Sequence, residues 1–343
     1  MKSKGIGKQT LVFTAPPHIV SAAAIVGDVE GEGPLADYFD VVLQDDIWGE
    51  ESWEKAERKM FEHAVRCALD KAELTPAKLD CLLGGDLLNQ IISANFAARE
   101  LQTPFLGLYG ACSTMAESLL IGSMLVDGGY AACVACAATS HFSTAERQYR
   151  QPLEMGGQTT PTAQRTVTGA GCSIVTDSAY AGKRVFNHVH IPAATIGRVV
   201  DLGITDAANM GAAMAPAAAD TLCVHLGDTG RGLDAYDLIV TGDLGTFGSE
   251  MFLSLCGDRG LDVAGRHFDC GCAIFGLDQK VDCGGSGCGC SASVLNAYLL
   301  RRLEAGELQR ILFMATGALL STTSGMQNDS IPGIAHGVVL ERK

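Results

Sequence analysis

The chain has 343 residues, of which 47% are hydrophobic and 19% are charged, and it contains 41 glycines. This composition excludes a disordered chain and leaves room for two domains, or for two halves that share one core. The formal net charge of −14 repels phosphate groups, so we expect no nucleic-acid partner and no direct adsorption to an anionic membrane.

The sequence lacks the marks of secretion and of membrane insertion. No apolar run reaches the roughly 18 residues that a spanning helix needs. The first residues, MKSKGIGKQTLVF, have neither the apolar segment nor the cleavage site of a secretory signal. We therefore expect a protein that is not secreted and that lies in a reducing, cytoplasm-like compartment. There, most of the 13 cysteines would be buried apolar residues without disulfides.

Amphipathic helices alternate with apolar strands along the chain. A long helix is predicted at 52–74, capped by Ser52 and ended by Thr75-Pro76. Apolar runs without polar alternation indicate strands buried on both faces. These runs are 79–86, 130–139, 236–243 and 310–318. The alternation predicts an α/β fold with a largely parallel sheet.

The segment GLYGACSTMAESLL, residues 107–120, places Cys112 in a tight turn before a helix predicted from Thr114 to Val126. Gly110 allows the bend. Cys112 or Ser113 would then lie at the helix start, where unpaired amides and the helix dipole lower a thiol's pKa and attract anions. Three roles stay open: a nucleophile that attacks a thioester, a corner that holds a carboxylate, and an inert buried cysteine.

Two parts of the chain repeat each other. Residues 79–87 match 236–244, and the segment that begins at Cys112 matches a later one that contains Cys290. The first pair is offset by 157 residues and the second by 178, so the second copy carries 21 extra residues around 245–285. This pattern predicts two halves related by a pseudo-twofold axis, residues 1–185 and 186–343, with their boundary somewhere in 170–220. The matched residues include Asp80 with Asp237 and Asp86 with Asp243.

Several polar residues are predicted to face a common ligand site. His141 follows an apolar strand at its carboxyl edge, which is the ligand side of open α/β sheets. The Gly/Ala/Met-rich segment 195–219 is expected to line the mouth of the site. Each of these residues has a structural alternative, as a hydrogen-bonded core residue, a loop residue or a helix cap. The predicted ligand-binding set is Cys112, Ser113, His141, Thr168, Asp201, Asp206, Asn209, Thr246 and His336.

Metal binding is the main alternative for the remaining cysteines and histidines. Five thiols within 21 residues have the composition of a zinc or iron–sulfur site, but their spacing matches no known pattern. His188 and His190 alternate on one strand face without a third ligand nearby in the sequence. We therefore expect no metal and no cofactor. The five thiols belong to Cys270, Cys272, Cys283, Cys288 and Cys290.

The tandem halves, with GACSTMAESL as the first turn, resemble the thiolase and ketoacyl synthase superfamily. This resemblance implies a five-layered αβαβα fold in which the cysteine of the first turn is acylated. It also implies that the second half supplies a His and an Asn, or two His. Here 244–248 reads Leu-Gly-Thr-Phe-Gly, and Cys288 replaces the Asn. Because condensation needs a proton carrier and oxyanion donors, the sequence predicts a protein that is not an enzyme, unless His225 or His267 substitutes.

A closer resemblance covers almost the whole chain. The stretches FDVVLQDDIWGEESWEKAE, TPTAQRTVTGAG and IGRVVDLGITDAANMGAAMAPAAADT are similar to the stage V sporulation protein AD family of spore-forming bacteria. That resemblance implies a non-catalytic protein that binds dipicolinic acid (pyridine-2,6-dicarboxylate), or its calcium chelate. It further implies uptake of this ligand into the developing spore and its release at germination.

The same resemblance sets the expectations on partners. It implies a peripheral protein of the spore inner membrane, held there by integral membrane subunits of the same transport assembly, and the fold suggests a homodimer. Two other functions stay open. One is an acyltransferase of the ketoacyl synthase III type that uses Cys112 as its nucleophile, and the other is a scaffold whose pocket binds nothing.

Overall fold

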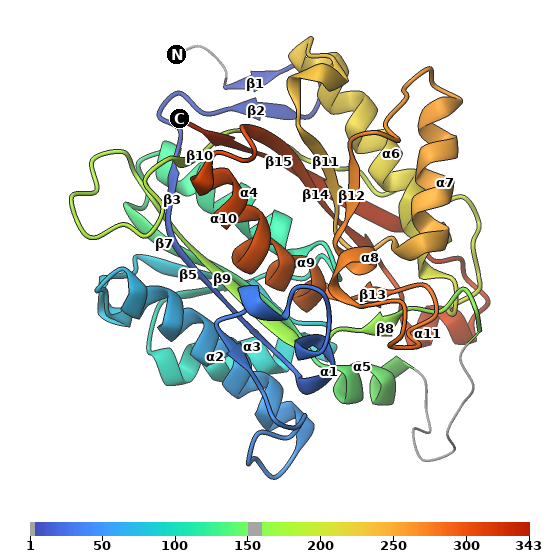
Figure 1. The fold of residues 1–343 in the computed structure, drawn as a ribbon, viewed down its shortest axis with the longest axis horizontal. Helices are drawn as coiled ribbons and strands as arrows, with labels where there is room; N and C mark the ends of the chain where they lie inside the picture. The colour runs from blue at the N-terminus through green and yellow to red at the C-terminus, as the bar shows by residue number, and fades with distance from the viewer. Residues whose placement is uncertain (1–3, 150–159) are drawn as a thin grey trace.

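A computed structural model describes residues 4–149 and 160–343, and in this part of the chain two sets of five strands carry the fold (Figure 1). The first set has the order β6–β5–β7–β9–β3 and the second the order β12–β11–β14–β15–β10. The sets meet where His18 of β3 pairs with His190 of β10. The strands of the first set are β3 (His18–Val26), β5 (Cys81–Gly85), β6 (Phe105–Gly107), β7 (Cys133–Ser140) and β9 (Gly169–Thr176), and those of the second are β10 (Val189–Thr195), β11 (Leu238–Thr241), β12 (His267–Asp269), β14 (Arg310–Ala318) and β15 (Gly333–Arg342).

The sheet is mixed, which corrects the prediction of a largely parallel one. Strands β6, β5 and β7 are parallel, as are β12, β11 and β14, whereas β9 and β15 run antiparallel to both of their neighbours. A parallel pair needs a crossover of a dozen or more residues, usually a helix. The link from β14 to β15 holds only the short helix α11 (Thr322–Met326), so the chain returns antiparallel.

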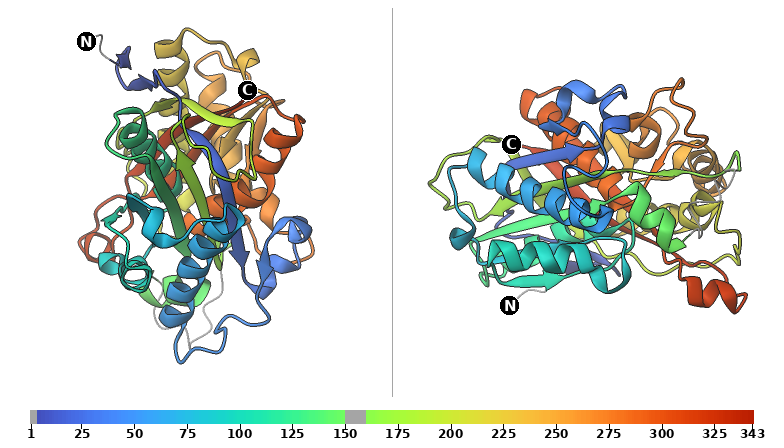
Figure 2. Two further views of the ribbon diagram at one scale, coloured as in Figure 1. Left: turned by 90° about the vertical axis from the view of Figure 1, so that its left-hand side faces the viewer. Right: turned by 90° about the horizontal axis from the view of Figure 1, so that it is seen from below.

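Helices form three layers around the strands (Figures 1 and 2). The central layer lies between the two sets of strands, because its helices contact both of them. It contains α4 (Thr114–Asp127), α9 (Cys288–Val294), the π-helical turn η6 (Leu295–Leu299) and α10 (Leu300–Ala305). The outer layers are α2 (Trp53–Lys71) with α3 (Ile92–Leu101), and α6 (Met210–Thr229) with α7 (Gly245–Gly257). The result is the five-layered αβαβα arrangement that the sequence predicts.

The predicted helices and strands are present with small shifts of their ends. The Ser52 hydroxyl accepts a hydrogen bond from the amide of Lys55 at 3.3 Å, so Ser52 caps α2 as expected. This helix ends at Lys71, a few residues before Pro76 opens the 3-10 turn η2 (Pro76–Lys78). The four predicted apolar strands correspond to β5, β7, β11 and β14.

The internal repeat is confirmed in its hydrogen bonds. Asp80 accepts hydrogen bonds from the amides of Ala132 and Cys133 at 2.7 and 3.0 Å. Its counterpart Asp237 accepts them from Gln309 and Arg310 at 2.6 and 2.9 Å. Each aspartate thus ties the start of one strand to the start of the neighbouring strand, β5 to β7 and β11 to β14.

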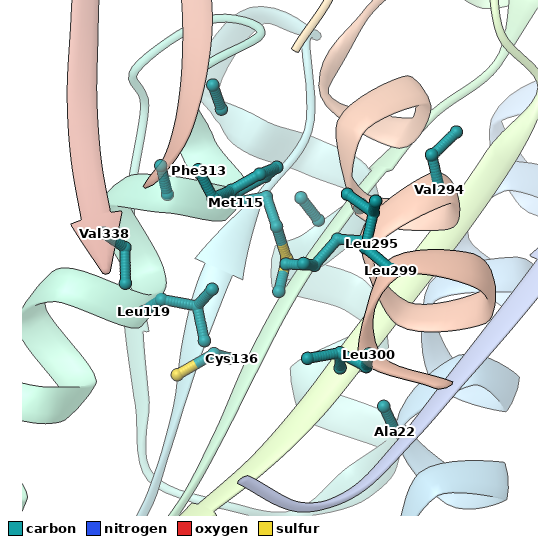
Figure 3. Close-up of a cluster of buried hydrophobic side chains, with 14 of the residues drawn as sticks. Ala22, Met115, Leu119, Cys136, Val294, Leu295, Leu299, Leu300, Phe313 and Val338 are labelled. Carbon is teal, nitrogen blue, oxygen red and sulfur yellow. The ribbon is translucent and has the colours of Figure 1, made fainter. Parts of the chain in front are cut away.

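The central layer is held by apolar packing between the two halves (Figure 3). Met115 and Leu119 of α4 belong to the same buried cluster as Leu295, Phe313 and Val338, and each of these side chains is 0% exposed. Burying one such side chain contributes about 1.5–3 kcal/mol. Since α4 begins two residues after Cys112, this packing also fixes the Cys112 turn.

The remaining elements are short. They are β1 (Gly5–Ile6), β2 (Thr10–Val12), α1 (Asp28–Gly31), η1 (Ala36–Tyr38), β4 (Val41–Val42), η3 (Asn89–Ile91), α5 (Phe142–Tyr149), β8 (Arg165–Thr166), η5 (Leu233–Ala235), α8 (Cys270–Ile274) and β13 (Gly285–Ser286). The segment with α8 and β13 lies within the predicted 21-residue insertion region. Among the described helices, none is long and apolar enough to cross a membrane.

Candidate functional site

The Cys112 turn is a tight structure stabilised by its own side chains. Ala111 adopts φ 49°, a left-handed conformation that is uncommon for a residue with a Cβ. The hydroxyl of Ser113 donates to the carbonyl of Gly110 at 2.7 Å, and that of Thr114 donates to the carbonyl of Ala111 at 2.8 Å. The neighbouring strand β14 passes so close that a Cβ on Gly317 would lie 2.4 Å from Gly110 O. The turn therefore has little freedom to move.

The Cys112 thiol faces groups from the second half of the chain. The carboxyl group of Asp243, the thiol of Cys288 and the backbone N–H of Gly287 are the groups that act most strongly on its charge. Asp243 follows β11, and Gly287 precedes α9. The pseudo-twofold arrangement thus brings the end of strand β11, in the second half, to the start of helix α4, in the first half.

This environment raises the pKa of the Cys112 thiol well above its usual range, first because the side chain is buried and second because Asp243 lies beside it. The sequence-based expectation of a lowered pKa is therefore corrected. The expectation relied on free amides at the helix start, but the amides of Ser113 and Thr114 bond to Gly110 O and Ala111 O at 3.0 and 3.3 Å. Burial and a neighbouring acid outweigh the helix dipole here.

Asp243 is held from several sides. Its Oδ1 accepts a hydrogen bond from the hydroxyl of Thr316 at 2.6 Å, and its Oδ2 accepts one from the amide of Gly287 at 3.0 Å. Burial raises the pKa of Asp243 to about 7 in spite of these donors. Near neutral pH, a protonated thiol therefore faces an acid that is partly protonated as well.

No imidazole is part of this arrangement. The sequence has eight histidines, all within the described residues, and none is among the groups that interact with the thiol. His225 bonds to the hydroxyls of Thr195 and Tyr236 at 2.7 and 2.5 Å, and His267 Nε2 bonds to the hydroxyl of Thr241 at 2.8 Å. Hydroxyl groups thus engage both of the imidazoles considered as substitutes from the sequence.

A cavity opens next to the thiol. Its free volume is about 540 Å³, including the part open to solvent. Apolar and small side chains dominate its walls, and Glu146 is the acidic residue among them. No lysine, arginine or histidine lines it among the described residues. The lining residues are Leu87, Ala111, Cys112, Ala145, Glu146, Tyr149, Thr166, Ala207, Met210, Ser286, Ala318 and Leu320.

A second, outer cavity adjoins the first. Its free volume is about 900 Å³, and Tyr149 and Leu320 belong to the walls of both cavities. The hydroxyl of Tyr149 donates to Leu87 O at 2.6 Å and lies 3.1 Å from the hydroxyl of Tyr109. Because the single hydrogen of Tyr149 is used on Leu87, the Tyr109 hydroxyl donates to Tyr149. This chain of hydrogen bonds fixes the ring of Tyr149, which lines both cavities.

Of the nine residues predicted to bind a ligand, Cys112 lines the inner cavity and Ser113 lies directly beneath it in the turn. His141 is buried elsewhere: its Nε2 donates to Asp46 O at 2.6 Å, and its Nδ1 accepts from the amide of Ser143 at 3.1 Å. Burial lowers the pKa of His141. The hydroxyl of Thr168 accepts a hydrogen bond from the amide of Phe142 at 3.1 Å.

The other predicted residues do not line the inner cavity. Asp201 accepts from the amide of Gly203 at 2.8 Å, Asp206 accepts from that of Ala208 at 2.9 Å, and Asn209 caps α6. Thr246 is exposed in the first turn of α7. His336 accepts from the amide of Gly197 at 3.1 Å, and burial lowers its pKa to about 4. The structure does not bring these residues together at one cavity.

Sequence reasoning missed the residues that form most of the cavity. Asp243 carried a signal, since it matches Asp86 in the repeat and both follow a buried strand. Tyr149 and Glu146 carried none, because an amphipathic helix such as α5 has no feature that marks its ligand side. Within 195–219, Ala207 and Met210 reach the cavity, in place of the polar residues of that segment.

The cysteines of the second half do not converge. Cys283, Cys288 and Cys290 donate to three different backbone carbonyls, those of Pro161, Thr139 and Gly242, at 3.0, 2.8 and 3.5 Å. Over residues 4–149 and 160–343, no group of three or more His, Cys, Asp or Glu side chains is arranged to hold a metal ion.

Comparison with known proteins decides the family. The profile of stage V sporulation protein AD matches residues 7–341. The chain is 47% identical to stage V sporulation protein AD of Bacillus subtilis (strain 168) over 336 residues, which covers 98% of this chain and 97% of that protein. The chain belongs to the stage V sporulation protein AD family. The family implied by the sequence strings is thus confirmed, and with it a role in sporulation.

Solved structures confirm the thiolase-like fold of this stage V sporulation protein AD family member. OleA of Xanthomonas campestris, bound to cerulenin, has a TM-score of 0.60 at 14% identity and covers 96% of this chain and 99% of that one. Human mitochondrial 3-ketoacyl-CoA thiolase, in complex with CoA, has a TM-score of 0.58 at 13% identity, covering 97% and 99%. The 3-oxoacyl-[acyl-carrier-protein] synthase III of Aquifex aeolicus VF5 has 0.57 at 14%, covering 95% and 99%. At these identities the likeness concerns the fold alone.

Proposed function

We propose that this sporulation protein is a non-catalytic binding protein that holds dipicolinic acid, or its calcium chelate, in the cavity beside Cys112. In this proposal it supports the uptake of the ligand into the developing spore and its release at germination. The observation that carries the proposal is the Cys112–Asp243 pair: the cavity of the fold is present, but its thiol faces an acid.

The chemistry of the pair supports a binding role over an acyl-transfer role. A thiol attacks as its thiolate, and both burial and the Asp243 carboxyl disfavour that form. Condensation further requires a group that carries a proton at the reacting carbonyl. No histidine of the described residues is among the groups that act most strongly on the Cys112 thiol, whereas a hydrogen bond to a ligand needs only the neutral thiol.

The charge of the cavity favours one form of the ligand. Dipicolinate is a flat dianion, and its two carboxylates would find no lysine, arginine or histidine in the described lining. Two like charges at close range destabilise each other by several kcal/mol in a protein interior. The calcium chelate carries no net charge, so we propose that the chelate binds better than the free dianion. The ring of Tyr149 and the side chain of Met210 give the slot the apolar faces that a planar ring requires.

Location and partners are part of the same proposal. With a net charge of −14 the chain does not favour an anionic lipid surface, so we place it at the spore inner membrane through integral membrane subunits. We also propose that the protein forms a homodimer. Strand β6 is the last strand of the sheet among the described residues, and its Leu106 is 49% exposed, which leaves a strand edge for pairing.

The second candidate is an acyltransferase that uses Cys112. It is favoured by the fold, since the solved structures named above include a synthase and a thiolase. Incubation with acyl-CoA separates the two functions. An enzyme of this type gains the mass of an acyl group on the peptide that contains Cys112, and Cys112→Ala abolishes the gain. For a binding protein we expect no adduct.

Calorimetric titration with dipicolinate, with and without calcium, tests the binding proposal directly. Ala207 is exposed on the cavity wall, so Ala207→Trp fills the mouth without disturbing the core. Ala181 is exposed on the loop between β9 and β10 and does not line either cavity, so Ala181→Trp is the matched control. We expect saturable binding that Ala207→Trp weakens at least tenfold and Ala181→Trp leaves unchanged. Absence of binding to the unmodified protein would favour the scaffold alternative.

A further inference from the structure

Two buried acidic side chains interact electrostatically close to residues that line the inner cavity. Glu57 of α2 and Asp86 at the end of β5 are both 0% exposed, and the charge of Asp86 acts directly on Glu57. Asp86 Oδ1 accepts from the amide of Leu88 at 2.7 Å, and its Oδ2 accepts from that of Ala94 at 2.8 Å. Because each carboxylate oxygen of Asp86 accepts a hydrogen bond from a backbone amide, these bonds favour the ionised form of the side chain.

Glu57 lacks such donors. Its Oε1 has no hydrogen-bond partner, and the buried hydroxyl of Ser93, which lies next to Glu57, has none of normal geometry either. Its Oε2 lies 2.8 Å from the hydroxyl of Thr144, which also lies 3.0 Å from His141 O. Thr144 has one hydroxyl hydrogen for these two acceptors. The carboxyl group of Glu57 thus relies on the hydroxyl groups of Thr144 and Ser93, and a proton on it would add a donor of its own.

We propose that Glu57 and Asp86 form a proton-binding site that holds both walls of the inner cavity in place. A single proton on Glu57 satisfies the contact to Thr144 or to Asp86 and removes one of two adjacent buried charges. Its neighbours come from four elements: Asp86 from β5, Ser93 from α3, Thr144 from α5 and the Cys288 thiol from α9. None of these residues lines the ligand cavity itself.

Two residues of the proton-binding site are direct sequence neighbours of residues that line the inner cavity. Thr144 lies on α5 next to Ala145 and Glu146, which line the inner cavity, and Asp86 precedes Leu87, which lines it from the other side. Loss of the proton would leave two adjacent carboxylates in the core, so the segments 86–94 and 142–149 would loosen. Burial raises the pKa of Asp86 to about 6 and, together with Asp86, raises that of Glu57 well above its usual range.

The direction of the pH effect follows from these shifts. A carboxyl group whose pKa is raised by folding stabilises the protein at low pH and loses this contribution as the pH rises to the folded pKa. Each such group makes the unfolding equilibrium constant rise by up to tenfold per pH unit in that range. The cavity walls are therefore held more firmly under mildly acidic than under alkaline conditions.

Glu57→Gln tests this proton site, because the amide supplies permanently the hydrogen that the proton supplies in the native protein. Glu62→Gln is the control on the same helix, where Glu62 pairs with Arg66 at 2.8 Å. Urea unfolding between about pH 5 and pH 9 should show a weaker pH dependence in Glu57→Gln, by up to tenfold in the equilibrium constant per pH unit. Glu62→Gln should retain the native dependence. An unchanged dependence in Glu57→Gln would overturn the proposal.

A measurement on the unmodified protein covers the case in which the variant does not fold. Amide hydrogen exchange, corrected for the intrinsic rate, should accelerate with pH in 86–94 and 142–149 relative to β3 and β15. Equal pH dependence in all four segments contradicts the proposal. A calcium titration is the second arm: stabilisation of the native protein by CaCl₂ that is absent in Glu57→Gln would assign the site to a cation instead of a proton.

Discussion

The Cys112 thiol and the Asp243 carboxyl group come from the two halves of the molecule and interact electrostatically. Cys112 precedes the central helix α4, Asp243 follows strand β11, and Thr316 of β14 fixes the carboxyl from behind at 2.6 Å. A carboxyl group in this place opposes ionisation of the thiol. The neighbouring acid therefore restrains the reactivity of the sulfur.

Asp243→Asn should make Cys112 more reactive toward alkylating reagents. The substitution keeps the shape of the side chain and removes its charge, so the pKa of the thiol falls toward its ordinary value while burial still raises it. Each unit by which this pKa falls increases the thiolate fraction, and hence the alkylation rate, about tenfold. Peptide mass spectrometry after timed alkylation measures the rate, with the exposed Cys272 as internal control. An unchanged rate at Cys112 would show that Asp243 does not govern the thiol.

The stability of the protein should depend on pH through Asp243. Folding raises the pKa of this group from 3.8 to about 7, because its carboxyl is buried. It therefore stabilises the folded state below about pH 4, and this contribution is lost as the pH rises to 7. The loss amounts to roughly 4 kcal/mol at most.

Urea unfolding of the native protein and of Asp243→Asn at several pH values checks this expectation. The stability advantage of the native protein over the variant should shrink between about pH 4 and 7 and stay constant above that range. A difference that does not vary with pH contradicts a raised pKa at Asp243.

Much of the fold could be predicted because it is encoded in local patterns. The period of α2, the cap at Ser52 and the apolar runs of β5 and β14 need no knowledge of distant residues. The repeat could be predicted for the same reason, since Asp80 and Asp237 perform the same task in each half. The direction of β15 was harder, because it depends on whether the connection from β14 contains a crossover helix.

The site could be predicted only in part, because it is assembled from distant segments. The tight turn at Cys112 is local, but the acid that faces it comes from the other half of the chain. Polar type alone did not separate ligand residues from structural ones: Asp201 and Asp206 bond to the backbone of their own loops. The same residue types serve both purposes, and only the position of the cavity distinguishes them.

Tyr149→Phe should open the passage between the two cavities. The substitution removes the hydrogen bonds to Leu87 O and Tyr109 but retains the ring. We expect Cys112 to react faster with a bulky thiol reagent relative to a small one, a ratio that does not depend on the thiol's pKa. Tyr109→Phe should have a smaller effect, because the bond from Tyr149 to Leu87 remains. Tyr130→Phe, at a residue that is 84% exposed and outside both cavities, is the control, and equal ratios in all variants would argue against a gate.

Gly317→Ala should displace the Cys112 turn. A Cβ at Gly317 would lie 2.4 Å from Gly110 O and 3.2 Å from the amide of Ser113, so β14 or the turn must shift. Overpacking of this kind costs about 1–3 kcal/mol of folding free energy. Gly325→Ala is the matched control, since nothing lies within 4 Å of a Cβ there. Urea unfolding should separate the two variants by more than 1 kcal/mol. The proposed dipicolinate binding should weaken in Gly317→Ala, because Cys112 and Ala111 move relative to Asp243. If Gly317→Ala were as stable as Gly325→Ala and bound dipicolinate equally well, the turn would be free to adjust.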